Sequence, residues 1–139
     1  MAPDILVAMD QSEVAKKALE YALEHHPEAE ITVLHVVGTP SGMMGKAVGL
    51  ALSDDIEGET EKQAEAVLDS AKAVADEHGA TIATKVRYGH PARAIVDEAA
   101  GFDAVVLGSH GGSMADRLFV GNVAETVFRR APVPVTVVR

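Results

Sequence analysis

The feature that most constrains this chain is the alternation of short, almost uninterrupted apolar runs with segments that are apolar on one helical face only. The runs are residues 4–9, 30–37, 81–87, 104–108 and 133–139. Residues 4–9 (DILVAM) and 104–108 (AVVLG) contain almost no polar side chain, which is typical of strands covered on both faces. Residues 81–87 (TIATKVR) alternate apolar and polar side chains, which favours a strand at an edge of the sheet.

Segments with helical periodicity lie between these runs. Apolar residues recur on one face of residues 12–26 and of residues 59–78, with Glu, Lys and Asp on the opposite face. Residues 91–100 begin with a proline, which suits the first turn of a helix, and a last helix is predicted over about residues 123–131. Helices that alternate with strands predict right-handed crossovers and a parallel sheet between two helical layers. We therefore predict a single α/β domain over residues 1–139, with a doubly wound sheet.

The composition argues against several classes of protein. The formal net charge is −9, so most of the surface would repel nucleic acid, and an anionic ligand would need local donors. The chain has no cysteine, which excludes disulfides and thiol catalysis. The N-terminal MAPDILVAMD lacks the basic region and cleavage site of a signal peptide, and no apolar run approaches the roughly 20 residues that span a bilayer. These features predict a cytoplasmic protein that binds neither nucleic acid nor membrane.

The stretch LGSHGGSMADRLFVGN, residues 107–122, carries four glycines between a predicted buried strand and a predicted helix. In a doubly wound sheet, ligands bind beyond the carboxyl ends of the strands, where the winding reverses. The two most apolar strands end at Asp10 and Gly108, which places a carboxylate beside a glycine-rich turn. Bare backbone and the helix N-terminus after Gly121 suit phosphate, whereas Asp10 suits a hydroxyl or a base N–H. The pattern predicts a nucleoside on the Asp10 side and phosphates beside residues 111–122.

Structural roles for the same residues stay open from spacing alone. Asp10 or Ser12 can cap the first helix, with Glu13 as the reciprocal residue if the cap is Asp10. Asn122 and Glu125 have the spacing of a second capping box, and the glycine before them can simply serve the turn. Glycines at strand–helix junctions therefore do not by themselves establish a ligand site.

No catalytic or metal-binding pattern is complete in the sequence. GMMGKA lacks the glycine and the hydroxyl residue of a Walker phosphate loop, since Pro40 and Ala47 occupy those places. Ser109 and His110 are neighbours, so their side chains point apart and cannot pair as nucleophile and base. The six histidines show no metal-ligand spacing, and His35, inside a predicted strand, is interpreted as an interior histidine with a hydrogen-bond partner. We predict no catalytic residue and no protein ligand to a metal.

The whole chain resembles the universal stress protein family. The opening ILVAMDQSEVAKKALEYAL, the central LHVV, the later GHPARAIVDEA and above all LGSHGGSMADRLFVGNVAETVFRRAPVPVTVVR are similar to that family's successive signatures. Its nucleotide-binding members carry the pattern Gly-x2-Gly-x9-Gly-Ser/Thr, and Gly108, Gly111 and Gly121 fit every glycine spacing. The resemblance implies an ATP-binding, Rossmann-like fold of the adenine nucleotide alpha hydrolase-like type. It also implies a five-stranded sheet in the order 3-2-1-4-5 and a dimer.

Carried over to this chain, the resemblance implies where adenosine would bind. Asp10 would contact the adenosine moiety, while Ala8 and Met9 would line the base pocket. Val36 would meet the adenine through its backbone, and Gly108 would lie against the ribose.

The resemblance also implies that Gly111, Gly121, Asn122 and Val123 would surround the phosphates. The chain departs from the family pattern at Asn122, where the pattern has Ser or Thr. An amide donates to phosphate but ligates Mg²⁺ less readily than a hydroxyl. ATP is therefore the favoured ligand, with any Mg²⁺ bound through its phosphates.

Three functions are consistent with these residues. The first is an ATP-binding module in stress response or signalling. The second is a slow ATPase or phosphotransferase, in which Arg117 or Lys46 would swing into the site. The third is a family member that binds no nucleotide and acts through its dimer surface, for which Asn122 is the best support.

A homodimer is predicted through residues 133–139 (VPVTVVR). This apolar strand would lie at an edge of the sheet, with its outer row of N–H and C=O groups without a partner. Pairing with the same strand of a second copy would satisfy that backbone, and a two-fold axis would make the pairing antiparallel.

Overall fold

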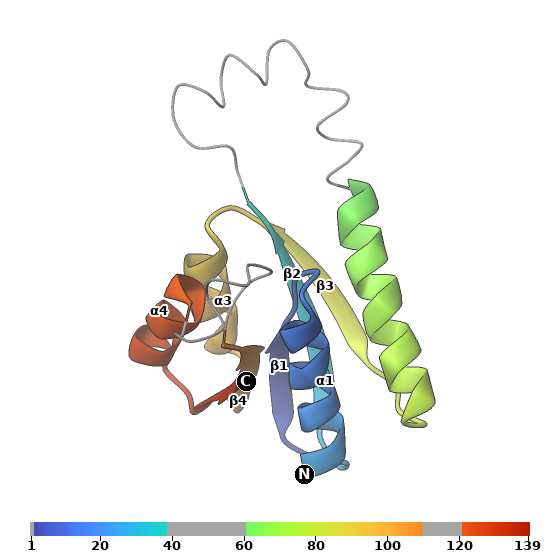
Figure 1. The fold of residues 1–139 in the computed structure, drawn as a ribbon. Coiled ribbons are helices and arrows are strands. Elements are labelled where there is room, and N and C mark those ends of the chain that lie inside the picture. Colours follow the sequence, from blue (N-terminus) through green and yellow to red (C-terminus); the bar gives the residue numbers. More distant parts are fainter. Residues whose placement is uncertain (1, 39–60, 110–120) are drawn as a thin grey trace.

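The computed structural model describes residues 2–38, 61–109 and 121–139. Its strands are β1 (Asp4–Ala8), β2 (Glu30–Val37), β3 (Ala83–Tyr88), β4 (Ala104–Gly108) and β5 (Val135–Val138). Its helices are α1 (Glu13–His25), α3 (Pro91–Ala99) and α4 (Asn122–Arg130), with a further helix over residues 61–77. No helix in these ranges has both the length and the apolar character needed to cross a membrane. The strands form one parallel sheet in the order β3-β2-β1-β4-β5, which confirms the predicted fold class (Figure 1).

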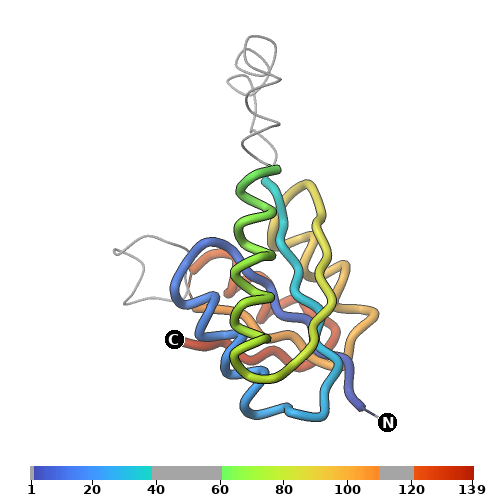
Figure 2. The backbone as a smooth tube through the Cα atoms, turned by 90° about the vertical axis from the view of Figure 1, so that its right-hand side faces the viewer, coloured from blue at the N-terminus to red at the C-terminus, as the bar shows by residue number. Residues whose placement is uncertain are grey.

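The two faces of the sheet pack against different helices, because successive side chains of a strand point to opposite sides. On β1, Ile5 and Val7 pack with α1 and with the helix at residues 61–77, whereas Leu6 packs with α3 and α4. Figure 1 shows these two pairs of helices on opposite sides of the sheet, and Figure 2 shows the helix at residues 61–77 lying along β2 and β3. The core therefore has two halves, which explains why β1 and β4 are apolar on both faces.

α1 begins at a cap that the sequence supplies. The Ser12 hydroxyl accepts a hydrogen bond from the Ala15 N–H at 3.2 Å, and Ser12 is the N-cap. Asp10 does not cap the helix, because its Oδ1 accepts from the Ser12 N–H at 2.8 Å instead. Glu13 lies beside Lys16, with 3.5 Å between Oε1 and Nζ. Asp10 therefore shapes the turn from β1 into α1, and Ser12 satisfies the first turn of the helix.

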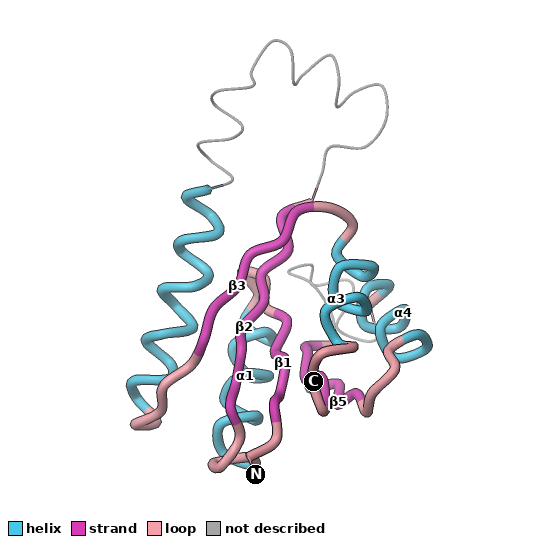
Figure 3. Tube along the Cα trace, turned by 180° about the vertical axis from the view of Figure 1, so that it is seen from behind, coloured by secondary structure: helices cyan, strands magenta, loops and turns pink. Residues whose placement is uncertain are grey.

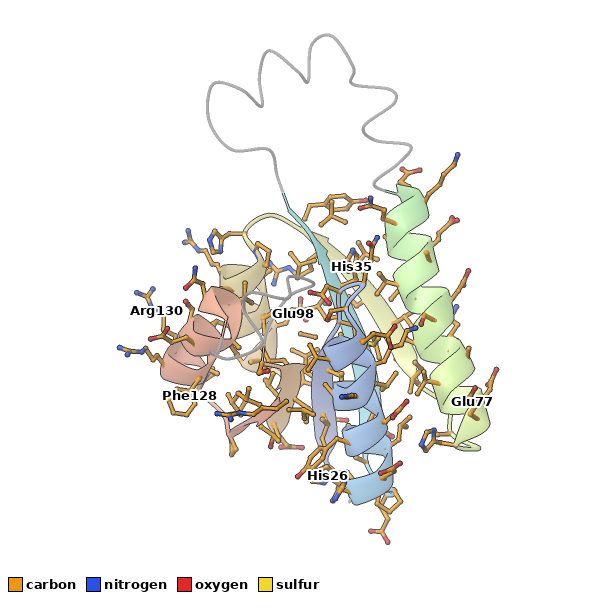
Figure 4. The ribbon with its side chains drawn as sticks, viewed as in Figure 1. His26, His35, Glu77, Glu98, Phe128 and Arg130 are labelled. Carbon is orange, nitrogen blue, oxygen red and sulfur yellow. The ribbon has the colours of Figure 1, made fainter. Side chains whose placement is uncertain are left out.

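Ion pairs fasten α3 to the edge strand β3. Glu98, which Figure 4 labels, lies 2.9 Å from Lys85 Nζ and 3.2 Å from Arg87 Nη1. Arg87 also donates to the Ala94 carbonyl at 3.4 Å. β3 lies at the edge of the sheet, as its alternating pattern predicts, and its lysine and arginine are side chains of the kind that protect edges.

The observed ends of two elements differ from the sequence prediction for reasons of proline chemistry. β5 covers Val135–Val138 rather than residues 133–139, because Pro134 has no N–H and contributes only its carbonyl, which accepts from the Val105 N–H at 2.9 Å. α4 ends at Arg130, and Ala131 is extended with ψ 137°, as the residue before a proline favours. Figure 3 shows β3 and β5 at opposite edges of the sheet.

Candidate functional site: a cavity at the carboxyl ends of the strands

A cavity of about 370 Å³ lies at the carboxyl end of the sheet. Its floor is formed by the last residues of β1, β2 and β4, and its walls by the first turns of α1, α3 and α4. This is where the winding of the sheet reverses, since the chain turns to one face after β1 and to the other after β4. The position agrees with the crevice that the sequence predicts.

The cavity brings together most of the residues that the sequence singled out. The predicted residues that line it are Ala8, Met9, Asp10, Val36, Gly108, Gly121, Asn122 and Val123. Gly111 lies outside the described residues. These side chains come from four elements far apart in the chain, so the fold itself assembles the predicted set.

Sequence reasoning missed other residues of the cavity wall. They are Ser12, Ala15, Leu34, Pro91, Ile95, Leu107 and Ala124. Two of them carried a signal, because Pro91 begins a helix that follows a strand, and helices that follow strands begin at the carboxyl edge of a parallel sheet. Ile95 lies one turn later on the same helix. Ser12 was considered only as a candidate helix cap. The remaining four are apolar strand or helix residues that a sequence pattern cannot distinguish from core.

The side of the cavity beside β1 and β2 is apolar, with one carboxylate at its margin. Leu34, Val36 and Ile95 form walls without side-chain hydrogen-bonding groups. Asp10 is exposed, and its Oδ1 is engaged by the Ser12 N–H. Its Oδ2 accepts no hydrogen bond from the described residues, so this oxygen is directed by the turn yet available to a donor on a ligand.

The opposite side of the cavity is the N-terminus of α4. The N-cap is Gly121, with φ −67° and ψ 160°, and no side chain caps the helix. The capping box predicted as an alternative for Asn122 is wrong, because Asn122 is the first helical residue and Glu125 pairs with Arg129 at 3.0 Å. The Gly121 N–H donates to the Ser109 carbonyl, which ties this end to β4. The helix therefore presents backbone N–H groups to the cavity, and no side chain among the described residues caps them.

Gly108 has a packing role that sequence reasoning did not assign. A Cβ at this position would lie 2.7 Å from Val14 Cγ1 and 3.2 Å from both the carbonyl carbon and the carbonyl oxygen of Val14. Only glycine therefore lets α1 approach β4 this closely. The predicted contact of Gly108 with a ribose remains a prediction, while its contact with α1 is an observed constraint.

The described residues contain no cluster of side chains of the kind that binds a metal ion. Among residues 2–38, 61–109 and 121–139, no three His, Asp or Glu side chains are grouped so as to hold a metal ion. His35 belongs to no such group in this part of the chain, and its Nδ1 lies 2.9 Å from the Met9 carbonyl oxygen. This contact confirms the interpretation of His35 as a histidine with an internal partner.

Comparisons with known proteins agree with this architecture. The model of the universal stress protein family matches residues 1–139. The universal stress protein YxiE of Bacillus subtilis is 34% identical over 144 residues, with 97% of each chain covered. The solved structure of the universal stress protein UspA from Lactobacillus plantarum has a TM-score of 0.82 and 26% identity, and the match covers 99% of this chain and 97% of that one.

A third relative was solved with a ligand. It is a universal stress protein in complex with cAMP, with a TM-score of 0.71 and 26% identity, and the match covers 99% of this chain and 97% of that one. The family model and the sequence relative match nearly the whole chain, and the two solved structures share its fold. This chain belongs to the universal stress protein family.

Proposed function

We propose that this protein binds an adenine nucleotide, with ATP favoured, in the cavity at the carboxyl ends of β1, β2 and β4, as a stress-response or signalling module. The observation that carries the proposal is the polarity of the cavity. One end is apolar with a carboxylate at its margin, and the other is the N-terminus of a helix that no described side chain caps. A nucleotide has the matching polarity, with an apolar base at one end and anionic phosphates at the other.

The base would lie against β2 and α3. Val36 lines the cavity at the end of β2, and Ile95 forms the wall on α3. The carboxylate of Asp10 would accept a hydrogen bond from a ribose hydroxyl or a base N–H, and it would repel a phosphate. This assigns the adenosine moiety to the β1 side of the cavity.

The phosphates would lie at the start of α4. Backbone N–H groups at a helix N-terminus, together with the positive end of the helix dipole, stabilise an anion. These local donors matter because the chain as a whole carries a net charge of −9. The relative solved with cAMP supports a nucleotide of the same chemical class.

Isothermal titration calorimetry with adenosine, AMP and ATP, each with and without Mg²⁺, tests the proposal. We expect saturable binding of ATP without rapid hydrolysis. Gly121→Val should weaken ATP, because a side chain at the N-cap would intrude on the phosphate side. Gly101→Val is the matched control, since a Cβ there meets only the Glu98 carbonyl at an ordinary 3.7 Å, at the far end of α3. No binding of any of the three ligands up to millimolar concentration would contradict the proposal.

The slow ATPase or phosphotransferase is a second candidate within the same site. It requires a base or a cation to approach the phosphates, and the residues suggested from sequence, Lys46 and Arg117, lie outside the described residues. Release of phosphate from ATP, measured over hours with Lys46→Ala and Arg117→Ala as comparisons, separates this activity from binding alone.

We also propose that the protein forms a homodimer through β5. All four residues of β5 are half-buried, although the strand consists of three valines and a threonine at the sheet edge. A second copy paired along this strand would bury the valines and satisfy the outer backbone groups. Light scattering should show a dimer for the wild type and a monomer for Val135→Lys and Val137→Lys. A monomeric wild type at tens of micromolar contradicts this interface.

A further inference from the structure

β1 and β2 separate at the edge of the cavity, and a histidine side chain occupies the point of separation. The parallel ladder between the two strands ends at the pair Ala8 and Leu34. The Met9 N–H still donates to the Leu34 carbonyl at 2.9 Å. The Met9 carbonyl oxygen lies 2.9 Å from His35 Nδ1. The His35 side chain therefore contacts the Met9 carbonyl oxygen, which would accept a backbone N–H of β2 if the ladder continued.

The backbone of Val36 is the group that lacks this ladder bond, and Val36 lines the proposed ligand site. In a parallel ladder, a carbonyl at the position of Met9 accepts from the N–H of the residue after its partner, which is Val36. The ladder ends before that bond, so the Val36 N–H does not donate to the Met9 carbonyl, which His35 contacts instead, and Val36 lines the cavity. The His35 contact also fixes the peptide that joins Met9 to Asp10, whose carboxylate lies at the margin of the cavity.

His35 acts from the opposite face of the sheet. Ile31 and Val33 pack towards α1 and the helix at residues 61–77, and His35 follows them in the alternation of β2. Leu34 and Val36 line the cavity on the other face, and His35 does not line it. Figure 4 shows His35 beside the loop that joins β1 to α1. A ligand in the cavity would therefore contact Val36 and Asp10, which the His35 bond holds in place, but not the imidazole itself.

We propose that His35 is a positioning residue of the nucleotide site: it holds the Met9 carbonyl from behind and thereby keeps the Val36 backbone and the Asp10 turn in place for the adenosine moiety. This inference rests on the proposed function. It implies that the neutral imidazole carries its proton on Nδ1, because a carbonyl oxygen only accepts hydrogen bonds. It also implies that the effect of His35 lies on the adenosine end of the ligand and not on the phosphates.

Two substitutions separate positioning from a merely structural role. His35→Leu removes the donor at similar size, whereas His35→Asn keeps an amide N–H close to the place of Nδ1. We expect His35→Leu to weaken adenosine and ATP by the same factor, about three- to tenfold, the scale of one hydrogen bond. His35→Asn should recover most of this loss. Titration calorimetry measures the affinities, and circular dichroism shows that each variant is folded.

Nitrogen-15 NMR of the wild type reports which ring nitrogen of His35 carries the proton. A purely structural role of His35 in packing would not determine this result. A bare Nδ1 with the proton on Nε2 overturns the inference, as does wild-type affinity in a folded His35→Leu variant, or an equal loss in both variants. If His35→Leu does not fold, His35→Met, which also lacks an N–H donor and is of similar size, takes its place under the same criteria. A wild type that binds none of adenosine, AMP and ATP overturns the proposed function and this inference with it, whereas wild-type binding with an unaffected variant overturns only the role of His35.

Discussion

The two faces of the sheet are built from alternate residues of the same strands, yet they end differently at the carboxyl edge. On the face covered by α1 and the helix at residues 61–77, packing continues to the end of the strands, where Val14 of α1 lies against Gly108. On the face covered by α3 and α4, the first turns of these helices border the cavity, and the start of α1 completes its wall. The first face closes the core, and most residues that line the candidate site lie on the second.

The difference shows how one fold separates stability from binding. Helices that pack closely need small residues at the contact, which Gly108 supplies on the first face. On the second face, Ile95 and the first residues of α4 border the cavity instead of filling it. Changes on the first face should therefore affect the free energy of unfolding, while changes on the second should affect ligand affinity.

The largest expected effect comes from truncating one core residue on each face. Leu19→Ala, at a side chain of α1 with 0% exposure, should lower the free energy of unfolding by about 2–5 kcal/mol. Ile95→Ala should cost stability towards the lower end of that range, because Ile95 already borders the cavity, and it should weaken adenosine. Urea denaturation and calorimetry measure the two quantities. A Leu19→Ala variant with weakened adenosine binding at unchanged stability would show that the packed face controls ligand affinity rather than stability, contrary to this expectation.

A smaller effect is expected from adding one methyl group at the close contact. Gly108→Ala should destabilise the protein by about 1–3 kcal/mol, because its Cβ would meet both the side chain and the backbone of Val14. Gly101→Ala is the matched control, with its Cβ 3.7 Å from the Glu98 carbonyl, and its stability should stay near that of the wild type. Equal midpoints of urea denaturation for the two variants would show that α1 shifts at no cost and that the contact does not limit packing.

On the cavity face, Asn122 tests the phosphate end by itself. Asn122→Ala should weaken ATP by about 1–2 kcal/mol, the scale of a hydrogen bond to a charged group, and should leave adenosine affinity unchanged. The variant should fold with wild-type stability, because Asn122 is not the N-cap of α4. Equal losses for ATP and adenosine in calorimetry would mean that the residue acts on the site through the fold.

The smallest expected effect is a pH dependence confined to the packed face. The Val74 carbonyl, which accepts from His78 Nδ1 at 2.9 Å, raises the pKa of His78 above its usual value, and Glu24 of α1 adds to the shift. The folded-state pKa is therefore above the unfolded value, so this stabilisation is complete below about pH 6.5 and is lost as the pH rises through the folded pKa.

Thermal denaturation between pH 5.5 and 8 should show this loss in the wild type and a smaller one in His78→Gln. Adenosine affinity should not follow His78 over the same range, because His78 lies at the end of the helix at residues 61–77, on the face opposite the cavity. A change in affinity that disappears in His78→Gln would show that the two faces are coupled.

Much of the fold follows from the sequence, because periodicity reports which side of an element is buried. The apolar runs at residues 4–9 and 104–108 predict strands covered on both faces, and the alternation in residues 81–87 predicts an edge; both predictions are confirmed. The residues named for the cavity also come together, because helices that follow parallel strands must begin at the same edge. Sequence determined the strands, the edge and the place of the crevice since each depends on local spacing, whereas the resemblance to a family supplied cavity residues such as Ala8, Met9 and Val36.

Tertiary structure decided the features that depend on distances between elements. The choice of Gly121 rather than Asn122 as the cap of α4 depends on how the chain leaves β4, where the Gly121 N–H bonds the Ser109 carbonyl. The need for glycine at position 108 depends on how closely α1 approaches. The bond from His35 to the Met9 carbonyl joins residues 26 apart, at the point where the ladder between β1 and β2 ends. A sequence pattern records which face is buried, whereas packing alone sets how near two buried faces come.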